Sequence, residues 1–385
     1  MEELRRQVLG ERFEALGLPN NKRTVLCLIV IEVVSFDRAL QKAKEYGPPE
    51  RCVLLLGNGF SIAWDKSIFS YNALFTDTDF SLAPTAQKAF EILGTKDFEE
   101  VIRYLDIASK LATCHAEHGL QIGEKFRVDS DFIKDALVRA VAQRHPDHVF
   151  VIPDDAYAST LSFLKNFGHV FTLNYDLLLY WTLATAGWEG WSDGFRRSEF
   201  LEGRLEWRDT FRETRQYQQN VHFLHGGLHL FESNGILTKI TSDGGKLVDQ
   251  IKMNIREGRA PLFVCEGTSA EKMQQITRHP YLRYCLTTFS RSGSILFTFG
   301  HSLGPSDAHV MKRMFAPSFR CVFVGLHGDP GSEANTKIIS AVRQWNSGNA
   351  INVEYYYTDS VELWNCEQSS SDAAHSVPDV AKRET

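Results

Sequence analysis

One short stretch, Val53–Leu56 followed by Gly57-Asn58-Gly59-Phe60-Ser61, limits most strongly how this chain can fold. Four apolar residues in a row predict a strand that is buried on both faces, which is typical of a parallel sheet. The glycines at 57 and 59 permit a sharp turn and leave room for a ligand to approach the backbone. A helix beginning just after the turn would direct free N–H groups at that ligand. The stretch therefore predicts a phosphate-binding turn, with Ser61 as an additional hydroxyl donor.

The composition is that of a globular chain of 385 residues, with 43% hydrophobic and 23% charged residues. This length suits one large domain or two ordinary ones. The formal net charge of −6 argues against general nucleic-acid binding, which is typical of basic proteins. The seven cysteines form no CxxC pair, so the sequence favours reduced thiols in a cytoplasm and predicts no metal site built on cysteines.

The two ends of the chain are expected to lie outside the main domain. Residues 1–34 form an N-terminal extension in this interpretation, and their charged start lacks the pattern of a secretory signal. The apolar run from Val25 to Val34 is interrupted by Glu32 and is far shorter than the roughly 20 residues that a membrane span needs. We therefore expect no membrane anchor. Residues 361–385 are rich in serine, alanine and charge, which predicts a disordered tail.

Between these ends, residues 35–360 are expected to form one α/β domain. Buried-strand patterns alternate with helical ones, which predicts a Rossmann-like, mostly parallel sheet. Residues 84–144 have apolar residues at helical spacing, which predicts a helical insertion that acts as a lid or an assembly surface. Ser233-Asn234-Gly235 predicts a hairpin turn. The expected strands cover residues 52–56, 169–173, 221–224, 262–265, 295–299, 321–325 and 351–357.

Four of these strands end in small or polar residues. Because ligands of a parallel sheet bind beyond the carboxyl ends of the strands, the four ends predict a cleft of dinucleotide size. They read Gly57–Ser61, Thr172-Leu173-Asn174-Tyr175-Asp176, Leu224-His225-Gly226 and Gly300-His301-Ser302-Leu303-Gly304.

The ordered set of motifs resembles the sirtuin-like NAD-binding family, which has a GAGxS phosphate turn, a TxNxD strand end and an HG dipeptide. Here they read Gly57–Ser61, Thr172–Asp176 and His225-Gly226, and Gly300–Leu303 looks like the family's GxSL segment near the adenosine. The TxNYD and LHG forms are similar to those of bacterial sirtuin-like NAD hydrolases in anti-phage defence. The resemblance covers roughly residues 50–330 and implies that NAD is bound as a substrate.

Two departures from the family pattern bear on the activity. Asn58 stands where alanine is usual, and Leu173 stands where the protein deacylases have glutamine. The chain also lacks the four-cysteine zinc ribbon that helps those deacylases to form a peptide cleft. The resemblance thus implies hydrolysis of NAD to nicotinamide and ADP-ribose rather than protein deacylation or ADP-ribosyl transfer. The alternative from another class is a module that senses NAD or ADP-ribose without turnover.

The residue types at these strand ends suit that chemistry. The Asn174 amide can hydrogen-bond ribose hydroxyls and a water. His225 belongs to the side-chain type that titrates near neutrality and can accept a proton. In the resembling family the matching asparagine and histidine are the catalytic pair. We therefore predict the catalytic residues Asn174, His225 and Asp176, and the cofactor-binding residues Gly57, Asn58, Gly59, Phe60, Ser61, Thr172, Gly300, Ser302 and Asp307.

Several of these residues also have a purely structural interpretation. Asp176 either orients a loop near the nicotinamide or caps the next helix. Phe60 and Tyr175 either stack on the cofactor or pack in the core. Asp307 and His309 either reach the adenosine side or cap a helix.

A metal site and a gate are the remaining questions that the sequence raises. His222, His225 and His229 suggest a metal site, but strand alternation sends 222 and 225 to opposite faces, so we expect no shared ion. A constitutive NAD hydrolase would harm its own cell. We therefore expect the helical block at residues 84–144 to gate the activity, and we expect a homo-oligomer or a triggering partner protein as a partner.

Overall fold

The computed structural model describes residues 31–114, 118–198, 204–208, 219–233, 235–241, 247–265, 268–349 and 351–365. The chain divides into a small unit, Met1–Val33, and a large unit, Val34–Thr385. The expected N-terminal extension therefore lies almost entirely outside the described residues. None of the described helices combines the length and the apolar character that crossing a bilayer requires.

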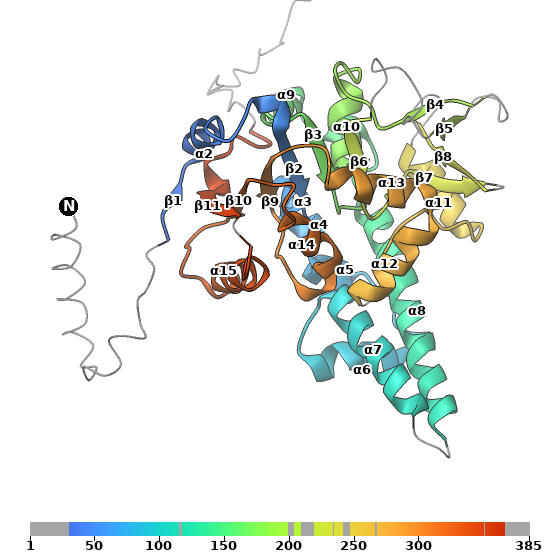
Figure 1. Ribbon diagram of the computed structural model, residues 1–385. Coiled ribbons are helices and arrows are strands. Elements are labelled where there is room, and N and C mark those ends of the chain that lie inside the picture. The colour runs from blue at the N-terminus through green and yellow to red at the C-terminus, as the bar shows by residue number, and fades with distance from the viewer. Residues whose placement is uncertain are drawn as a thin grey trace, which may run out of the picture. The chain divides into compact units, whose positions relative to one another are not determined.

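The large unit is built around one sheet with the strand order β1-β11-β10-β9-β2-β3-β6 (Figure 1). Every strand pair from β11 across to β6 is parallel. The strands are β1 (Val33–Val34), β2 (Cys52–Leu56), β3 (His169–Thr172), β6 (Val221–Phe223), β9 (Ile295–Phe299), β10 (Cys321–Leu326) and β11 (Asn352–Tyr357).

The strand order reverses next to β2. From β2 the chain goes outward to β3 and β6 on one side, and later returns to place β9, β10 and β11 on the other side. This is the order of a doubly wound dinucleotide-binding fold, whose ligands bind beyond the strand ends at the reversal. The prediction of a Rossmann-like α/β fold is confirmed.

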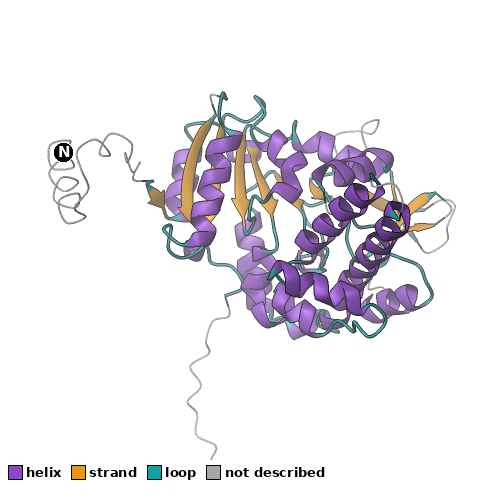
Figure 2. Cartoon of the chain, turned by 90° about the horizontal axis from the view of Figure 1, so that it is seen from below, coloured by secondary structure: helices purple, strands orange, loops and turns teal. Residues whose placement is uncertain are grey.

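The central strands are buried along their whole length because helices flank the sheet (Figure 2). The helices are α2 (Phe36–Ala43), α3 (Gly59–Trp64), α4 (Lys66–Phe69), α5 (Tyr71–Thr76), α6 (Pro84–Leu93), α7 (Phe98–Thr113), α8 (Gly119–Arg144), α9 (Asp154–Leu164), α10 (Leu178–Thr185), α11 (Leu247–Arg256), α12 (Ser269–Arg278), α13 (Pro280–Phe289), α14 (Ala308–Met314) and α15 (Glu333–Trp345), with short 3₁₀ turns that include η6 (Pro305–Asp307).

A second, antiparallel sheet lies beside the first, on the right in Figure 1. Its strands are β4 (Phe195–Arg197), β5 (Leu205–Trp207), β8 (Ile236–Lys239) and β7 (Leu230–Ser233), in this order. The pairing of β7 with β8 confirms the predicted hairpin.

The predicted strand over residues 262–265 is wrong. This segment forms only a single antiparallel bridge, between Phe263 and Gly226. Its backbone instead hydrogen-bonds the loop after β6, because the Val264 N–H donates to the His225 carbonyl (2.9 Å) and the Leu262 carbonyl accepts from Gly227 (2.8 Å). A short apolar segment that hydrogen-bonds a loop has the same sequence pattern as a short buried strand, so the sequence alone does not distinguish the two.

The predicted helical insertion consists of α6, α7 and α8. Pro84 occupies the first turn of α6, and Gly94 ends that helix with a left-handed φ of 65°. Asp97 then caps α7 by accepting a hydrogen bond from Glu100. In Figure 1 this block, in cyan, lies below the carboxyl ends of β2 and β9.

Residues 361–365, which the sequence analysis assigned to the tail, are described by the structure. Leu363 and Trp364 are 9% and 6% exposed, so these two side chains pack on the folded domain. The Trp364 ring packs 5.1 Å from that of Phe60, and its indole N–H donates to the Phe60 carbonyl at 3.0 Å. Leu363 and Trp364 stand in a stretch rich in polar residues, which gives only a weak sequence signal for burial. Residues 366–385 lie outside the described residues.

Replacing Trp364 with alanine is therefore expected to lower the free energy of unfolding by about 3–5 kcal/mol, because it empties a buried aromatic site. Urea unfolding followed by circular dichroism measures this change. The matched control is Phe150→Ala, at a ring that is 80% exposed, which is expected to change stability by no more than about 0.5 kcal/mol. Equal stabilities of the two variants would contradict the assignment of Trp364 to the folded domain.

Candidate functional site

A cavity of about 790 Å³ lies beyond the carboxyl ends of the strands, at the reversal of the strand order. Ligand pockets typically have volumes of about 300–1,000 Å³. Its wall includes the turn after β2, the ends of β3, β6 and β9, and residues near the ends of β10 and β11. The helical insertion closes part of it, through Asp97, Glu99, Leu137 and Val141. The strand ends that the sequence analysis grouped therefore do face one cavity.

The glycines of the first turn are required by packing between two strand ends. The Gly59 N–H donates to the Gly300 carbonyl at 2.8 Å, and a Cβ on Gly59 would overlap the Cα of Gly300. A Cβ on Gly57 would lie 2.6 Å from the Gly300 oxygen. All three glycines line the cavity, but the space expected beside Gly59 for a ligand is taken by Gly300. The helix that follows, α3, has only six residues.

Three predicted cofactor-binding residues do not line the cavity. Phe60 is 1% exposed and packs against Trp364, so its core interpretation holds. Thr172 is 1% exposed, and its hydroxyl accepts a hydrogen bond from the Asn174 backbone N–H at 3.0 Å. Ser61 is fully buried and hydrogen-bonds two other side chains. These three side chains therefore do not face the cavity, and a direct role in cofactor binding stays a prediction for them.

Two further predicted cofactor-binding residues do line the cavity. Asn58 lies on the wall, and its amide donates to the Phe69 carbonyl at 3.1 Å, which ties the turn to α4. Ser302 is an exposed residue of the wall in the loop after β9.

Ser61 links two of the predicted catalytic residues. Its hydroxyl donates to Asp176 Oδ2 at 2.5 Å and accepts from Asn174 Nδ2 at 2.9 Å. The other oxygen of Asp176 accepts from the Leu178 N–H at 2.9 Å at the start of α10. Asp176 therefore both caps a helix and, through Ser61, fixes the Asn174 amide. Burial raises the pKa of Asp176, although its hydrogen bonds from Ser61 and Leu178 act in the opposite direction.

The Asn174 amide oxygen has no hydrogen-bond partner among the described residues. Asn174 lines the cavity and is 7% exposed, and its Oδ1 is buried and unpaired. The hydrogen bonds of Ser61 distinguish the amide nitrogen from the amide oxygen. Ser61 donates its own proton to Asp176, so the Asn174 atom that faces it must be the donor Nδ2. An unpaired buried acceptor is unfavourable by about 1–3 kcal/mol, so a ligand hydroxyl that donates to it would be favoured.

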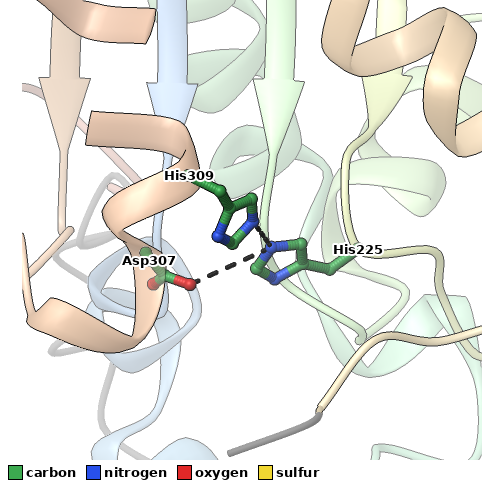
Figure 3. Close-up of side chains that lie close together, drawn as sticks. All are labelled: His225, Asp307 and His309. Carbon is green, nitrogen blue, oxygen red and sulfur yellow. Dashed lines mark hydrogen bonds and ion pairs between the residues drawn. The ribbon is translucent and has the colours of Figure 1, made fainter. Parts of the chain in front are cut away.

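His225 lies on the same cavity wall in a neutral state. The ring is 1% exposed, and its Nε2 lies 3.0 Å from His309 Nε2 and 3.9 Å from Asp307 Oδ1 (Figure 3). Burial, reinforced by the nearby Lys272 ammonium, lowers the pKa of His225 well below its ordinary value. The pKa near neutrality expected from the residue type is therefore wrong for this site, but the neutral ring retains a lone pair that can accept a proton.

Asp307 lies beside His225 in a charged network. Its Oδ1 accepts from Lys272 at 3.0 Å, and its Oδ2 lies 3.1 Å from His301 Nε2. Lys272 is completely buried and also donates to Glu99 of the helical insertion at 2.7 Å. Burial alone would raise the pKa of Asp307, but Lys272 and His301 hold it well below the usual value, so Asp307 is charged. The sequence placed Asp307 toward the adenosine, whereas the structure groups it with His225.

The grouping of histidines differs from the one that the sequence suggests. His222 contacts Gln219 and His169, and neither ring nitrogen of His229 has a partner among the described residues. His225 instead forms a cluster with Asp307 and His309, whose possible ligand atoms all lie within 4.8 Å of one another.

Several residues of this network were missed by sequence reasoning. Glu99, Ser269 and Lys272 belong to no motif at a strand end, and His301 was noticed only as part of the segment after β9. One signal was present: Thr268 and Glu271 form a capping box at the start of α12, a pattern that locates a helix start. It does not tell which residues of that helix face a site.

Comparison with known proteins gives a family but no activity. Residues 54–364 match the DUF4917 family, which is described as a domain of unknown function. No curated protein matches the chain. The matched residues extend from β2 to Trp364 and include the whole cavity wall described above. Because the match covers most of the chain, this protein belongs to the DUF4917 family.

Proposed function

We propose that the protein is an NAD hydrolase that cleaves the bond between nicotinamide and ribose. The observation that carries this proposal is the position of Asn174 and His225 on one cavity at the reversal of a dinucleotide-type strand order. The Asn174 amide oxygen needs a donor, which a ribose hydroxyl supplies, and the neutral His225 ring can serve as a base.

The two ends of the cavity can be assigned to the two halves of NAD. The wall runs from Asn174 and His225 to Asn335, Thr358 and Asp359, near the ends of β10 and β11. In sheets of this order a dinucleotide crosses the reversal point. We place the nicotinamide ribose at the first end and the adenosine at the second. The diphosphate would then lie near the Gly57–Gly59 turn, where two glycines and Asn58 form the wall.

The reaction balances with water as the only co-reactant. The C1′–N bond of the nicotinamide riboside breaks, and its electron pair goes to the ring nitrogen, so neutral nicotinamide leaves. The oxocarbenium-like ribose is attacked at C1′ by a water oxygen. The proton lost by that water goes to His225 and then to solvent. The products are nicotinamide, ADP-ribose and a proton.

Product analysis with the full chain tests this function. The protein is incubated with NAD, and nicotinamide and free ADP-ribose are measured by chromatography while binding is followed by thermal shift. We expect equal amounts of the two products. Stabilisation by NAD without product would favour the sensing module instead. Nicotinamide without free ADP-ribose would indicate ADP-ribosyl transfer. If the protein neither binds NAD nor forms product, the proposal is contradicted.

The biological role that we propose with this activity is depletion of NAD in defence against phage, in line with the resemblance in sequence. Phage infection of cells that carry the protein should then lower cellular NAD. Cells that carry the His225→Ala variant should keep their NAD. Equal NAD levels in both strains after infection would contradict the role without contradicting the activity.

A further inference from the structure

The contacts behind His225 form a chain of three side chains from three elements. His225 Nε2 faces His309 Nε2 at 3.0 Å, and His309 Nδ1 lies 3.1 Å from the Ser269 hydroxyl. That hydroxyl also accepts the backbone N–H of His309 at 2.7 Å, so α12 and α14 hold each other in register. Both histidines are buried. His309 and Ser269 do not line the cavity, and Figure 3 shows that the His225 nitrogen facing His309 is also the one that faces Asp307.

The two nitrogens of His225 have different surroundings. No residue that the structure describes hydrogen-bonds Nδ1, although His225 lines the cavity. Nε2 faces His309 and the charged Asp307. The nearest charged atom that faces Nε2 is the Asp307 carboxylate oxygen Oδ1, at 3.9 Å. A carboxylate oxygen that faces Nε2 favours a proton on that nitrogen, because a lone pair there would point at negative charge.

We propose that His309, oriented by Ser269, is a positioning residue that keeps the proton of His225 on Nε2 and leaves the Nδ1 lone pair open to the cavity. In this tautomer the His225 Nε2–H donates to His309 Nε2. The His309 Nδ1–H then donates to the Ser269 oxygen, which has two lone pairs for its two donors. The inference rests on the proposed function: the lone pair is the one that takes the proton from the attacking water, and His309 stabilises the imidazolium that results.

A bound metal ion is the rival explanation of the same cluster. Two imidazoles and a carboxylate are a common donor set for zinc. However, the Nε2–Nε2 distance of 3.0 Å is that of a hydrogen bond, and the oxygen of Asp307 that faces His225 already accepts from Lys272. The contacts thus explain the cluster without an ion, and the experiment below includes metal binding as an outcome that would overturn the proposal.

The first part of the test compares two substitutions at one position. His309→Gln keeps an amide in place of the ring and can still hydrogen-bond His225 Nε2, whereas His309→Leu cannot. We expect His309→Leu to lower kcat for nicotinamide release by about 10- to 100-fold with little change in KM. The His309→Gln variant should keep most of the wild-type kcat. Equal losses in both variants, or a loss confined to KM, would overturn the positioning role. His148→Ala, at a histidine outside the cavity wall, is the control for nonspecific loss.

The second part does not depend on activity. Full-length protein with ¹⁵N-labelled histidine is studied by long-range ¹H–¹⁵N spectroscopy at pH 7, with His225→Ala used to assign the signals. We expect His225 as the Nε2–H tautomer in the wild type and a mixture of tautomers in His309→Leu. A wild-type Nδ1–H tautomer would overturn the proposal. So would one equivalent of zinc that binds the wild type and is lost in His309→Leu. If the wild type releases no nicotinamide, the proposed function is contradicted. The tautomer of His225 still tests whether His309 keeps the proton on Nε2.

Discussion

Replacing His225 with alanine is expected to lower the rate of nicotinamide release by about 10²–10⁴-fold, the contribution of a positioned base. Binding of NAD should persist, because the second end of the cavity and the backbone turns after β2 and β9 are unchanged. Steady-state release of nicotinamide and a thermal-shift titration with NAD measure the two effects. His148→Ala, with its ring outside the cavity wall, should behave as the wild type. A folded His225→Ala protein that releases nicotinamide at the wild-type rate would exclude His225 as the base.

The pH dependence follows from the environment of the same ring. The charged and titratable groups around it are Lys272, Asp307, His301 and His309, and burial with Lys272 lowers the His225 pKa well below the ordinary value. A lowered pKa keeps the base deprotonated as the pH falls, so kcat/KM should stay level down to about pH 6.5, the ordinary histidine pKa, and fall only below it. A fall in kcat/KM centred above that value would contradict this environment for His225 in the free enzyme.

Replacing Asn174 with alanine should cause a loss of nicotinamide release of similar size. The amide is held by Ser61 and Asp176, and its oxygen has no hydrogen-bond partner among the described residues. In the proposed mechanism, removing it takes away the group that would fix the ribose relative to His225. Asn166→Ala is the matched control, because that amide bonds only backbone carbonyls at the end of α9 and does not line the cavity.

The double variant of Asn174 and His225 tests whether the two residues act as one unit. In that case the combined loss should be clearly smaller than the product of the two single losses. Losses that multiply fully would show that the residues act independently. Thermal denaturation of each variant separates loss of function from loss of the fold.

The sequence predicted well what depends on local pattern. The run Cys52–Leu56 has the bounds of β2, and Ile295–Phe299 those of β9, because a short, mainly apolar run that ends at a glycine has few alternatives. The position of Asn174 and His225 on one cavity could be predicted because the carboxyl ends of parallel strands meet at one edge of a sheet.

What the sequence could not predict depends on distant contacts. Gly59 predicts space for a ligand beside the backbone, but Gly300, in the turn after β9, occupies that space. Ser61 has the right position in the motif, yet its hydroxyl is used by Asp176 and Asn174. Lys272 lies 35 positions from Asp307 in the sequence and 173 from Glu99, and no periodicity joins residues so far apart.

The buried Lys272 ammonium has a consequence for how the protein unfolds. One of its two carboxylate partners, Glu99, belongs to the helical insertion, while the other, Asp307, belongs to the loop after β9. If the insertion opened or melted alone, a cation with no exposure to solvent would lose a partner, and breaking such a pair typically costs about 3–5 kcal/mol. Opening α7 alone should therefore cost a sizeable part of the free energy of global unfolding. The insertion and the sheet should melt in a single cooperative transition, although the sequence separates them as two blocks.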